Sequence, residues 1–456
     1  MYYKLLEILA PMDRCHSGPE MLSAYKLLVE HYKGSRLLTY NQKCSVNYWS
    51  LPPYWTCSYA TLKDSKGEVI ASYGESKLSL FTYSPSVNKI VSLSELQNHL
   101  FSDPNRADAI CFHFRNQYRH WKPIWGFSIP DNIRKKLKED QYQVVIKTNM
   151  DYDKPLVQSD FHHKGASNET YLFVGHFDHP AQVNDGLSGC IVAYEIIKRL
   201  QNRNTRFSYR ALSSVEIVGS SHYLDNSHSD SENLKEAIFL AFAGIDAKLA
   251  YQQSYKKKSF LDRIVIFLMK FYNDNDKNIF LHREIVGNDE NIFDSVGYEI
   301  PCGTLMRQPF FEYHTDSDNM SITSKDKLEE VIDFCIQIID IIENNFYFSS
   351  NMPGMPCLSH PDIDLYLSLD TISGTSGNSK NDLGRFDCEL PNHERRYLQE
   401  NTDLLYQLMQ NILRLGDGQH TIFDLAEVSN LPFGFVSKYA SLLQEKNIIM
   451  FHDNKK

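Results

Sequence analysis

The segment from Tyr142 to Asn345 alternates strand-like and helix-like patterns, and this alternation constrains the fold more than any other feature of the chain. Runs such as TYLFVGHF and AIFLAFAG are apolar and rich in β-branched and aromatic residues. Between them lie helical patterns such as CIVAYEIIKRL and KLEEVIDFCIQIIDIIENN. We therefore predict an α/β domain with a mixed, mostly parallel sheet flanked by helices. Ligand sites in such sheets lie at the carboxyl ends of the strands.

The flanking segments differ in character and predict further modules. Residues 1–36 have helical spacing and are assigned, with 140–350, to the α/β domain. Residues 37–139 contain short aromatic, Thr and Val runs broken by Pro and Gly, which predicts an inserted β-rich module. Residues 351–395 are rich in Pro, Gly, Ser and Asn and indicate an irregular linker. In 396–456, helices around the turn SNLP precede a short strand, which is the pattern of a winged-helix domain.

Charge and composition exclude several partners. The formal net charge of −10 argues against nucleic-acid binding, which requires a basic surface. The C-terminal segment also has more acidic than basic residues, so we expect it to contact a protein partner or a second copy of the chain.

We see no signal-peptide pattern and no apolar stretch long enough to span a bilayer. The nine scattered cysteines form no C-x-x-C pair. A cytoplasmic protein with reduced thiols is the expectation.

The string H-x-D-H-P-x(3)-N-D-G-x-S-G, which starts at His176, follows a predicted strand and runs into a predicted helix. Imidazole and carboxylate groups are ligands that zinc accepts, so we predict His176 and Asp185 as metal ligands. An acid two residues from a ligand histidine can hold the second ring nitrogen, and Asp178 is predicted to orient His176 in this way. His179 either replaces or supplements His176 as a ligand.

A second polar string, YHTDSDN, contains His314 and lies between a predicted strand and a predicted helix. His314 is therefore predicted to complete the metal site from another strand. Ser317 or Asp318 could instead serve only as a cap for the helix that follows. The two roles are compatible, because capping does not require His314.

Three further acidic sites are candidates, of which two follow predicted strands and the third precedes the turn at Gly297. Glu216 is a candidate general base or metal ligand, and the alternative is a solvated surface residue. Asp246 is a candidate metal ligand after the run AIFLAFAG, but an ordinary turn aspartate fits equally well. The stretch Asn288–Phe293 could line the substrate site, although a plain polar loop is the favoured interpretation.

Together these motifs resemble the zinc aminopeptidase superfamily, which includes bacterial leucyl aminopeptidases and glutamate carboxypeptidase. In that superfamily a His-x-Asp, a bridging Asp in an N-D-x-x-S-G turn, a Glu pair, a later Asp and a final His hold two zinc ions. The matching residues here are His176, Asp178, Asp185, Asp246 and His314. The chain is more closely similar to bacterial polysaccharide-biosynthesis proteins with an aminopeptidase-like domain, an inserted β-rich module and a C-terminal winged helix.

The resemblance implies one or two zinc ions, a zinc-exopeptidase-like fold, and hydrolysis of a peptide, an aminoacyl group or another small amide-bearing substrate. It also implies that Glu216 takes a proton from water. One departure is that the superfamily has two adjacent Glu residues where this chain reads Val215-Glu216. Glu216 is then either the base, with one metal short of a ligand, or a ligand, with the base missing. The alternative function is a metal-binding or regulatory protein that acts through its winged-helix module.

Overall fold

The computed structural model describes residues 2–41, 45–138, 140–226, 233–272, 278–367, 391–401 and 403–455. The chain forms two compact units. The first unit contains residues 1–261 and 280–333, and the second contains residues 262–279 and 334–456.

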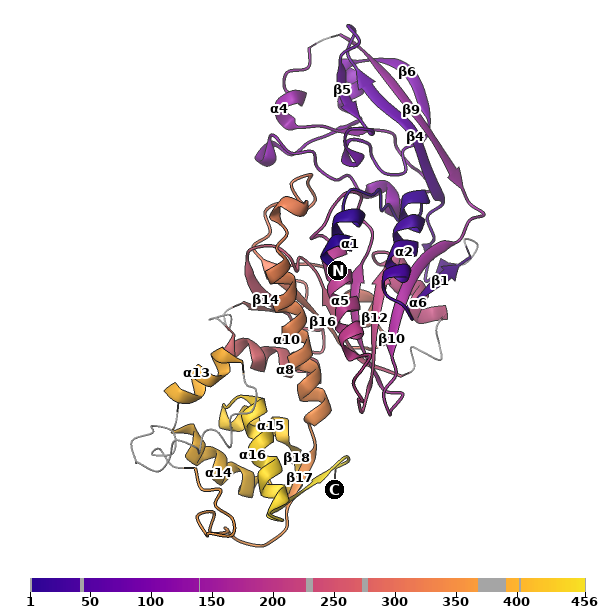
Figure 1. Cartoon of the computed structure of the whole chain (residues 1–456). Coiled ribbons are helices and arrows are strands. Elements are labelled where there is room, and N and C mark those ends of the chain that lie inside the picture. Colours follow the sequence, from indigo (N-terminus) through magenta and orange to yellow (C-terminus); the bar gives the residue numbers. More distant parts are fainter. Residues whose placement is uncertain are drawn as a thin grey trace. The chain divides into compact units, whose positions relative to one another are not determined.

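An eight-stranded sheet with the order β1-β10-β12-β11-β13-β16-β14-β15 organises the first unit (Figure 1). The four central strands β12, β11, β13 and β16 are parallel, whereas β1, β10 and β14 are antiparallel to their neighbours. This arrangement confirms the predicted mixed, mostly parallel sheet. The strands are β1 (Arg36–Tyr40), β10 (Leu156–His163), β11 (Thr170–His176), β12 (Ser208–Ser214), β13 (Leu234–Leu240), β14 (Lys248–Gln252), β15 (Ile279–Phe280) and β16 (Cys302–Gln308).

Helices α1 (Tyr2–Leu9), α2 (Pro19–His31) and α5 (Leu187–Leu200) cover the sheet face that is turned toward the viewer in Figure 1. The helix α5 packs on β11 and β12, whose residues are all buried. At Gly189 a Cβ atom would lie 1.9 Å from the Leu240 carbonyl oxygen. Only glycine therefore lets α5 approach the sheet this closely. Two further helices, α6 (Val218–Asn226) and α9 (Glu290–Phe293), also belong to this unit.

A second, antiparallel sheet of four strands has the order β5-β4-β9-β6. Its strands are β4 (Tyr54–Lys63), β5 (Val69–Ser72), β6 (Val87–Ser92) and β9 (Gln141–Asp151), and Trp55, Leu62 and Val144 belong to its core. The run QVVIKT lies in β9, although its sequence suggested a strand of the α/β domain. In contrast, β1 joins the large sheet. Residue patterns reveal that a segment is a strand but not which sheet it joins.

Several short elements complete this part of the chain. They are β2 (Ser45–Val46), β3 (Trp49–Ser50), α3 (Leu93–Gln97), β7 (Leu100–Phe101), β8 (Phe127–Ser128) and α4 (Asp131–Arg134). The segment between β7 and β8 reaches the large sheet's loops, since the Phe112 N–H donates to the His314 carbonyl oxygen at 2.8 Å.

The second unit combines helices with a three-stranded sheet of order β18-β17-β19. Thr421 and Asp424 form a capping box at the start of α15, and Asn430 ends this helix in the left-handed conformation. The residue pattern from Tyr397 to Leu413 predicts one helix, but the structure has two helices there, α13 and α14. The identification of residues 396–456 as a winged helix stays a prediction. Within the predicted linker, residues 368–390 lie outside the residues that the structure describes. The second unit contains the part of α8 (Phe260–Phe271) that begins at residue 262 and the part of α10 (Lys325–Asn344) that begins at residue 334. Its other elements are β17 (Tyr347–Ser350), α13 (Asn392–Glu400), α14 (Leu404–Arg414), β18 (Asp417–Thr421), α15 (Ile422–Ser429), α16 (Phe433–Glu445) and β19 (Ile449–His452).

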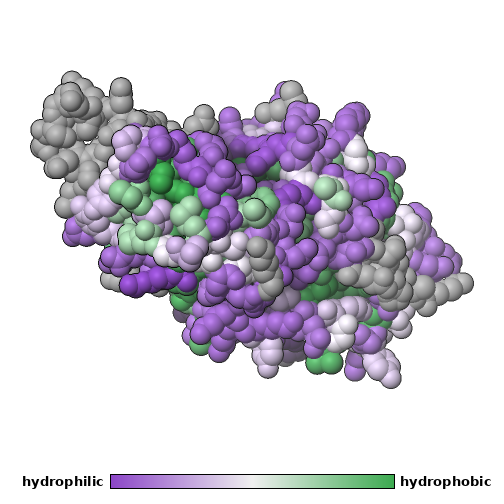
Figure 2. Space-filling model, turned by 90° about the horizontal axis from the view of Figure 1, so that it is seen from below, coloured by the Kyte–Doolittle hydropathy of each residue, from purple (hydrophilic) through white to green (hydrophobic). Residues whose placement is uncertain are grey.

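The face drawn in Figure 2 is mainly hydrophilic, and hydrophobic residues gather on it only in small groups. Scattered apolar residues of this kind are ordinary on protein surfaces. Within the part of the chain that the structure describes, no helix has the length and apolar character needed to cross a membrane.

Candidate functional site

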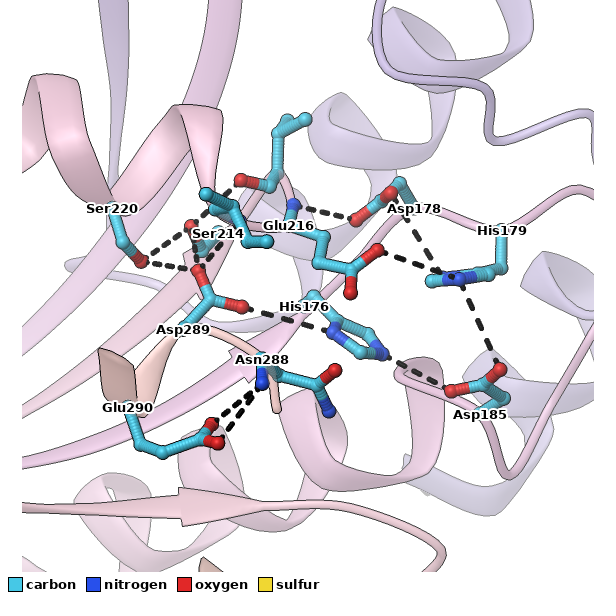
Figure 3. Close-up of polar contacts among 12 residues, drawn as sticks. His176, Asp178, His179, Asp185, Ser214, Glu216, Ser220, Asn288, Asp289 and Glu290 are labelled. Atoms are coloured by element: carbon cyan, nitrogen blue, oxygen red, sulfur yellow. Dashed lines mark hydrogen bonds and ion pairs between the residues drawn. The ribbon is translucent and has the colours of Figure 1, made fainter. Parts of the chain in front are cut away.

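The site lies at the carboxyl edge of the central parallel strands. His176 is the last residue of β11, Glu216 follows β12 by two residues, and His314 follows β16. Because parallel strands end at the same edge, these residues meet although they are far apart in the sequence. Figure 3 shows the side chains that converge there.

The Asp185 carboxylate lies at the centre of three imidazole rings. One of its oxygens is 3.2 Å from His176 Nε2, and the other is 3.0 Å from His314 Nε2 and 3.8 Å from His179 Nε2. Asp185, His176 and His179 are buried. Burial lowers the pKa of His179 to about 4, which keeps its ring neutral and able to act as a ligand. The structure therefore brings together His176, Asp185 and His314, and adds His179, which the sequence left as an alternative.

Glu216 lies beside this group and faces His179 (Figure 3). Its carboxylate oxygen Oε2 is 3.8 Å from His179 Nε2 and accepts a 2.5 Å hydrogen bond from the Tyr118 hydroxyl. Burial raises the pKa of Glu216 to about 7. Glu216 is thus a group of the site and not a solvated surface residue. Tyr118 comes from the segment between β7 and β8, and no sequence motif had identified it.

Asp178 belongs to the site, but it does not hold His176 as the sequence had predicted. One of its oxygens accepts the Glu216 backbone N–H at 2.9 Å, and the other is 3.0 Å from His16 Nε2. The chain leaves β11 after His176 and turns, so Asp178 points toward Glu216 and the N-terminal segment. The predicted pairing of Asp178 with His176 is therefore corrected.

Asp289 contacts His176 in its place. Its Oδ2 atom is 3.7 Å from His176 Nδ1, while Oδ1 accepts hydrogen bonds from the Ile217 N–H at 3.1 Å and the Ser220 hydroxyl at 2.5 Å (Figure 3). The interpretation of this stretch as a plain polar loop was thus wrong for Asp289, which is fully buried. No local pattern distinguishes it from Glu290, whose carboxylate accepts the backbone N–H of Asn288.

The structure places Asp246 apart from these groups. Its side chain is 92% exposed and forms a 3.5 Å ion pair with Lys327. The chain continues for six residues beyond the end of β13 before it reaches Asp246, and by then it has left the carboxyl edge. The prediction that Asp246 is a metal ligand is corrected on this geometry, and the alternative of an ordinary turn aspartate fits.

Asp318 holds the loop that carries Asp185. Its buried carboxylate accepts the backbone N–H groups of Val183 at 3.2 Å, Asn184 at 2.8 Å and Asp185 at 2.8 Å. The sequence had suggested only a helix cap for Asp318. Gly186, which directly follows Asp185, has φ +97°, and a Cβ atom there would lie 2.2 Å from the His176 ring. The turn therefore requires glycine.

The donor set fits a divalent cation. Asp178, Asp185 and Asp289 are buried within one cluster together with the largely buried Glu216, and an excess of buried negative charge is costly without a cation. His179 Nδ1 and Asp289 Oδ2 are buried and have no hydrogen-bond partner within the described residues. Two overlapping groups, His176/His179/Asp185 and Asp178/His179/Glu216, each have potential ligand atoms within 4.8 Å of one another. Imidazole nitrogens and carboxylate oxygens are ligands that zinc prefers.

A pocket of about 570 Å³ opens against Glu216 and His314. Much of its wall is aromatic, from Phe114, Phe242, Phe310 and Tyr313. Concave sites with mostly apolar walls and a few polar groups are typical of small-molecule binding. We refer to this cavity as the main pocket.

Comparison with known proteins places these features in a family. The family described as a domain of unknown function (DUF4910) matches residues 3–345. A protein of Clostridium acetobutylicum, named as a polysaccharide biosynthesis protein with an aminopeptidase-like domain, is 29% identical over 444 residues, which cover 96% of this chain and 93% of that protein.

Two solved structures share the fold. A crystal structure described as a peptidase from Clostridium acetobutylicum has a TM-score of 0.81 and 24% identity, with 99% of this chain and 96% of that chain covered. The zinc aminopeptidase BSAP from Bacillus subtilis has a TM-score of 0.55 and 13% identity, with 75% and 93% covered. These similarities confirm the zinc-exopeptidase-like fold that the resemblance implied.

Proposed function

The chain belongs to the family described as a domain of unknown function (DUF4910), and from that premise we propose that it is a metal-dependent hydrolase of aminopeptidase type. It cleaves an aminoacyl or amide bond. The observation that carries the proposal is the carboxylate of Asp185, faced by the Nε2 atoms of three histidines at 3.0–3.8 Å. Such convergence of ligand atoms in a buried, acidic cluster is what a zinc site requires.

His176, His179, Asp185 and His314 would hold the metal. Zinc, when bound, supplies Lewis-acid polarisation of a scissile carbonyl and makes water a stronger acid. Asp289 faces the remaining nitrogen of His176 and fixes the orientation of that ring.

Glu216 moves the proton. Its Oε2 atom faces the histidine cluster and the main pocket, so it can take a proton from the attacking water and return it to the leaving amine. The Tyr118 hydroxyl and the contact from Asp178 to the Glu216 backbone keep the carboxylate in place. The sequence allowed Glu216 to be either the base or a metal ligand, and we assign it as the base.

The main pocket favours a substrate with an uncharged side group. Its described wall contains no Lys or Arg, and Glu216 is its only carboxylate. A peptide, an aminoacyl group or an amide on a small molecule meets this condition. The name of the clostridial relative adds a precursor of a surface polysaccharide to these candidates.

The Glu216→Gln variant tests the proposal. We expect hydrolysis of a panel of neutral aminoacyl amides by the zinc-loaded protein to fall by roughly 100- to 10,000-fold in this variant, because the proton acceptor is lost. Glu299→Gln, which changes an exposed residue, serves as the matched control and should retain full activity. Turnover by Glu216→Gln at the rate of the parent chain would exclude Glu216 as the base.

A second function is favoured by one observation. Val215, a fully buried apolar residue, stands beside Glu216 where zinc aminopeptidases have a Glu pair. The alternative is a metal-binding or regulatory protein that acts through its C-terminal helices on a protein partner. Elemental analysis after expression with added zinc, manganese and cobalt separates the two cases. Bound metal together with turnover supports the hydrolase, and bound metal without turnover on any amide supports the regulatory role.

A further inference from the structure

We propose that a second pocket, next to the main one, binds a neutral carbohydrate ring of the substrate. This sugar pocket has a volume of about 290 Å³, and its wall includes Tyr48, Trp49, Gln117, His120 and Trp121. The inference deepens the proposed hydrolase function and rests on it in one respect, because it assigns the ring to the substrate of that site.

The sugar pocket adjoins the catalytic groups. Trp49 and Tyr118 line both the sugar pocket and the main pocket. The same Tyr118 donates its hydroxyl hydrogen to Glu216 Oε2 at 2.5 Å. Glu216 lines the main pocket, and Val218, two residues further along the chain, lines the sugar pocket. A ligand that fills both pockets would therefore pass beside Glu216.

The aromatic side chains offer flat apolar surfaces. Tyr48 is 99% exposed and Trp121 is 66% exposed, and both belong to the wall of the sugar pocket. Exposed aromatic residues grouped at one concave site usually mark a binding surface. The C–H face of a pyranose ring stacks well on tryptophan and tyrosine, because these rings combine a large apolar area with few rotatable bonds.

Gln117 supplies the second, independent observation. Its side chain is 1% exposed, lines the sugar pocket, and has neither amide oxygen nor amide nitrogen hydrogen-bonded within the described residues. A buried amide without partners costs about 1–3 kcal/mol, so such groups normally meet a ligand or a water. A sugar hydroxyl both donates and accepts, and it can satisfy both ends of this amide.

His120 adds a further unpaired atom to the same wall. Its Nε2 atom is 3.2 Å from the Ser50 hydroxyl, whereas its buried Nδ1 atom has no hydrogen-bond partner within the described residues. Burial lowers the pKa of His120, so the ring is neutral and offers a hydrogen bond without a charge.

The charge of the wall restricts the ligand. None of the described residues that line the sugar pocket is Asp, Glu, Lys or Arg. A phosphate, a carboxylate or an ammonium group would lose its hydration there without gaining a counter-charge. Aromatic faces together with neutral hydrogen-bonding groups instead match an uncharged sugar, such as an N-acylated amino sugar.

Tryptophan fluorescence provides the test. The chain has four tryptophans, of which Trp49 and Trp121 line the sugar pocket, whereas Trp55 and Trp125 are buried elsewhere. We expect the methyl glycoside of N-acetylglucosamine to change the emission of the full-length chain and to saturate at millimolar concentrations. Glucosamine 6-phosphate, whose charge finds no counter-charge in the wall, should leave the emission unchanged.

Two variants assign the binding to this pocket. Trp121→Ala and Gln117→Leu should each weaken sugar binding about tenfold, a loss of about 1.4 kcal/mol. Gln117→Leu should not lower the free energy of unfolding, because the replaced amide is unpaired in the free protein. Ile90→Ala, at an exposed position in β6, is the control and should bind like the parent chain. Isothermal calorimetry checks Trp121→Ala independently of emission.

The titration is carried out on Glu216→Gln in the presence of a chelator, so it does not depend on turnover or on metal. Sugar binding by this variant, together with no hydrolysis of any amide by the zinc-loaded parent chain, would overturn the hydrolase proposal and leave the sugar pocket standing. The absence of any sugar binding, equal binding of glucosamine 6-phosphate, or parent-like affinity in both pocket variants would overturn the sugar pocket.

Discussion

Asp246 and Asp289 show how far single residues can be assigned from their position in the sequence. Asp246 is exposed beside Lys327, whereas Asp289 is buried beside His176. His176, Asp185, Glu216 and His314 were predictable because each follows a recognisable strand or motif. Asp289 was not, because it lies in a loop that only the tertiary structure brings to the strand ends.

The two aspartates give a matched pair of variants. We expect Asp289→Asn to lower zinc affinity by roughly 10- to 100-fold, because His176 loses the partner that orients its ring. Asp246→Asn should bind zinc like the parent chain. Competition with a chelating indicator measures both affinities. A larger loss in Asp246→Asn than in Asp289→Asn would contradict the ligand assignment.

At the scale of secondary-structure elements, strands and loops determine the geometry of the site. The alternation of strands and helices correctly predicted the parallel centre of the sheet, since those strands are long and apolar. It did not predict that β9 belongs to the small sheet and β1 to the large one, because strand pairing depends on contacts between distant segments. It also did not reveal that Asp318 joins the His314 loop to the Asp185 turn.

The Asp318 contact leads to a prediction for these two loops. Asp318→Asn keeps the size of the side chain but replaces one of the two carboxylate oxygens that accept three backbone N–H groups. We expect the free energy of unfolding to fall by about 1–3 kcal/mol and zinc binding to weaken. Urea denaturation measures the former. Ser317→Ala, at the exposed neighbouring position, should change neither quantity, and a similar loss in both variants would refute the role of Asp318.

For the whole molecule, the metal ligands belong to only one of the two compact units. All proposed ligands lie within residues 1–261 and 280–333. A ligand that binds only the folded state stabilises the unit that holds it, by about 4 kcal/mol at a thousandfold excess over the dissociation constant.

Calorimetry with and without zinc checks this division. We expect two unfolding transitions, of which zinc raises the temperature of one and leaves the other unchanged. Calcium, which prefers oxygen ligands, serves as the control cation and should have little effect. Equal shifts of both transitions would argue against a site confined to the first unit.

The backbone at two of the histidines bears on how relatives of this chain can diverge. His179 and His314 have φ values of 82° and 56°, a region that asparagine and glycine enter readily and β-branched residues avoid. Relatives that no longer catalyse hydrolysis would not need an imidazole at these two positions, but their turns would still require a positive φ there. Descendants that have lost the metal should therefore carry asparagine or glycine at both positions, and a survey of their sequences would reveal such lineages without any assay.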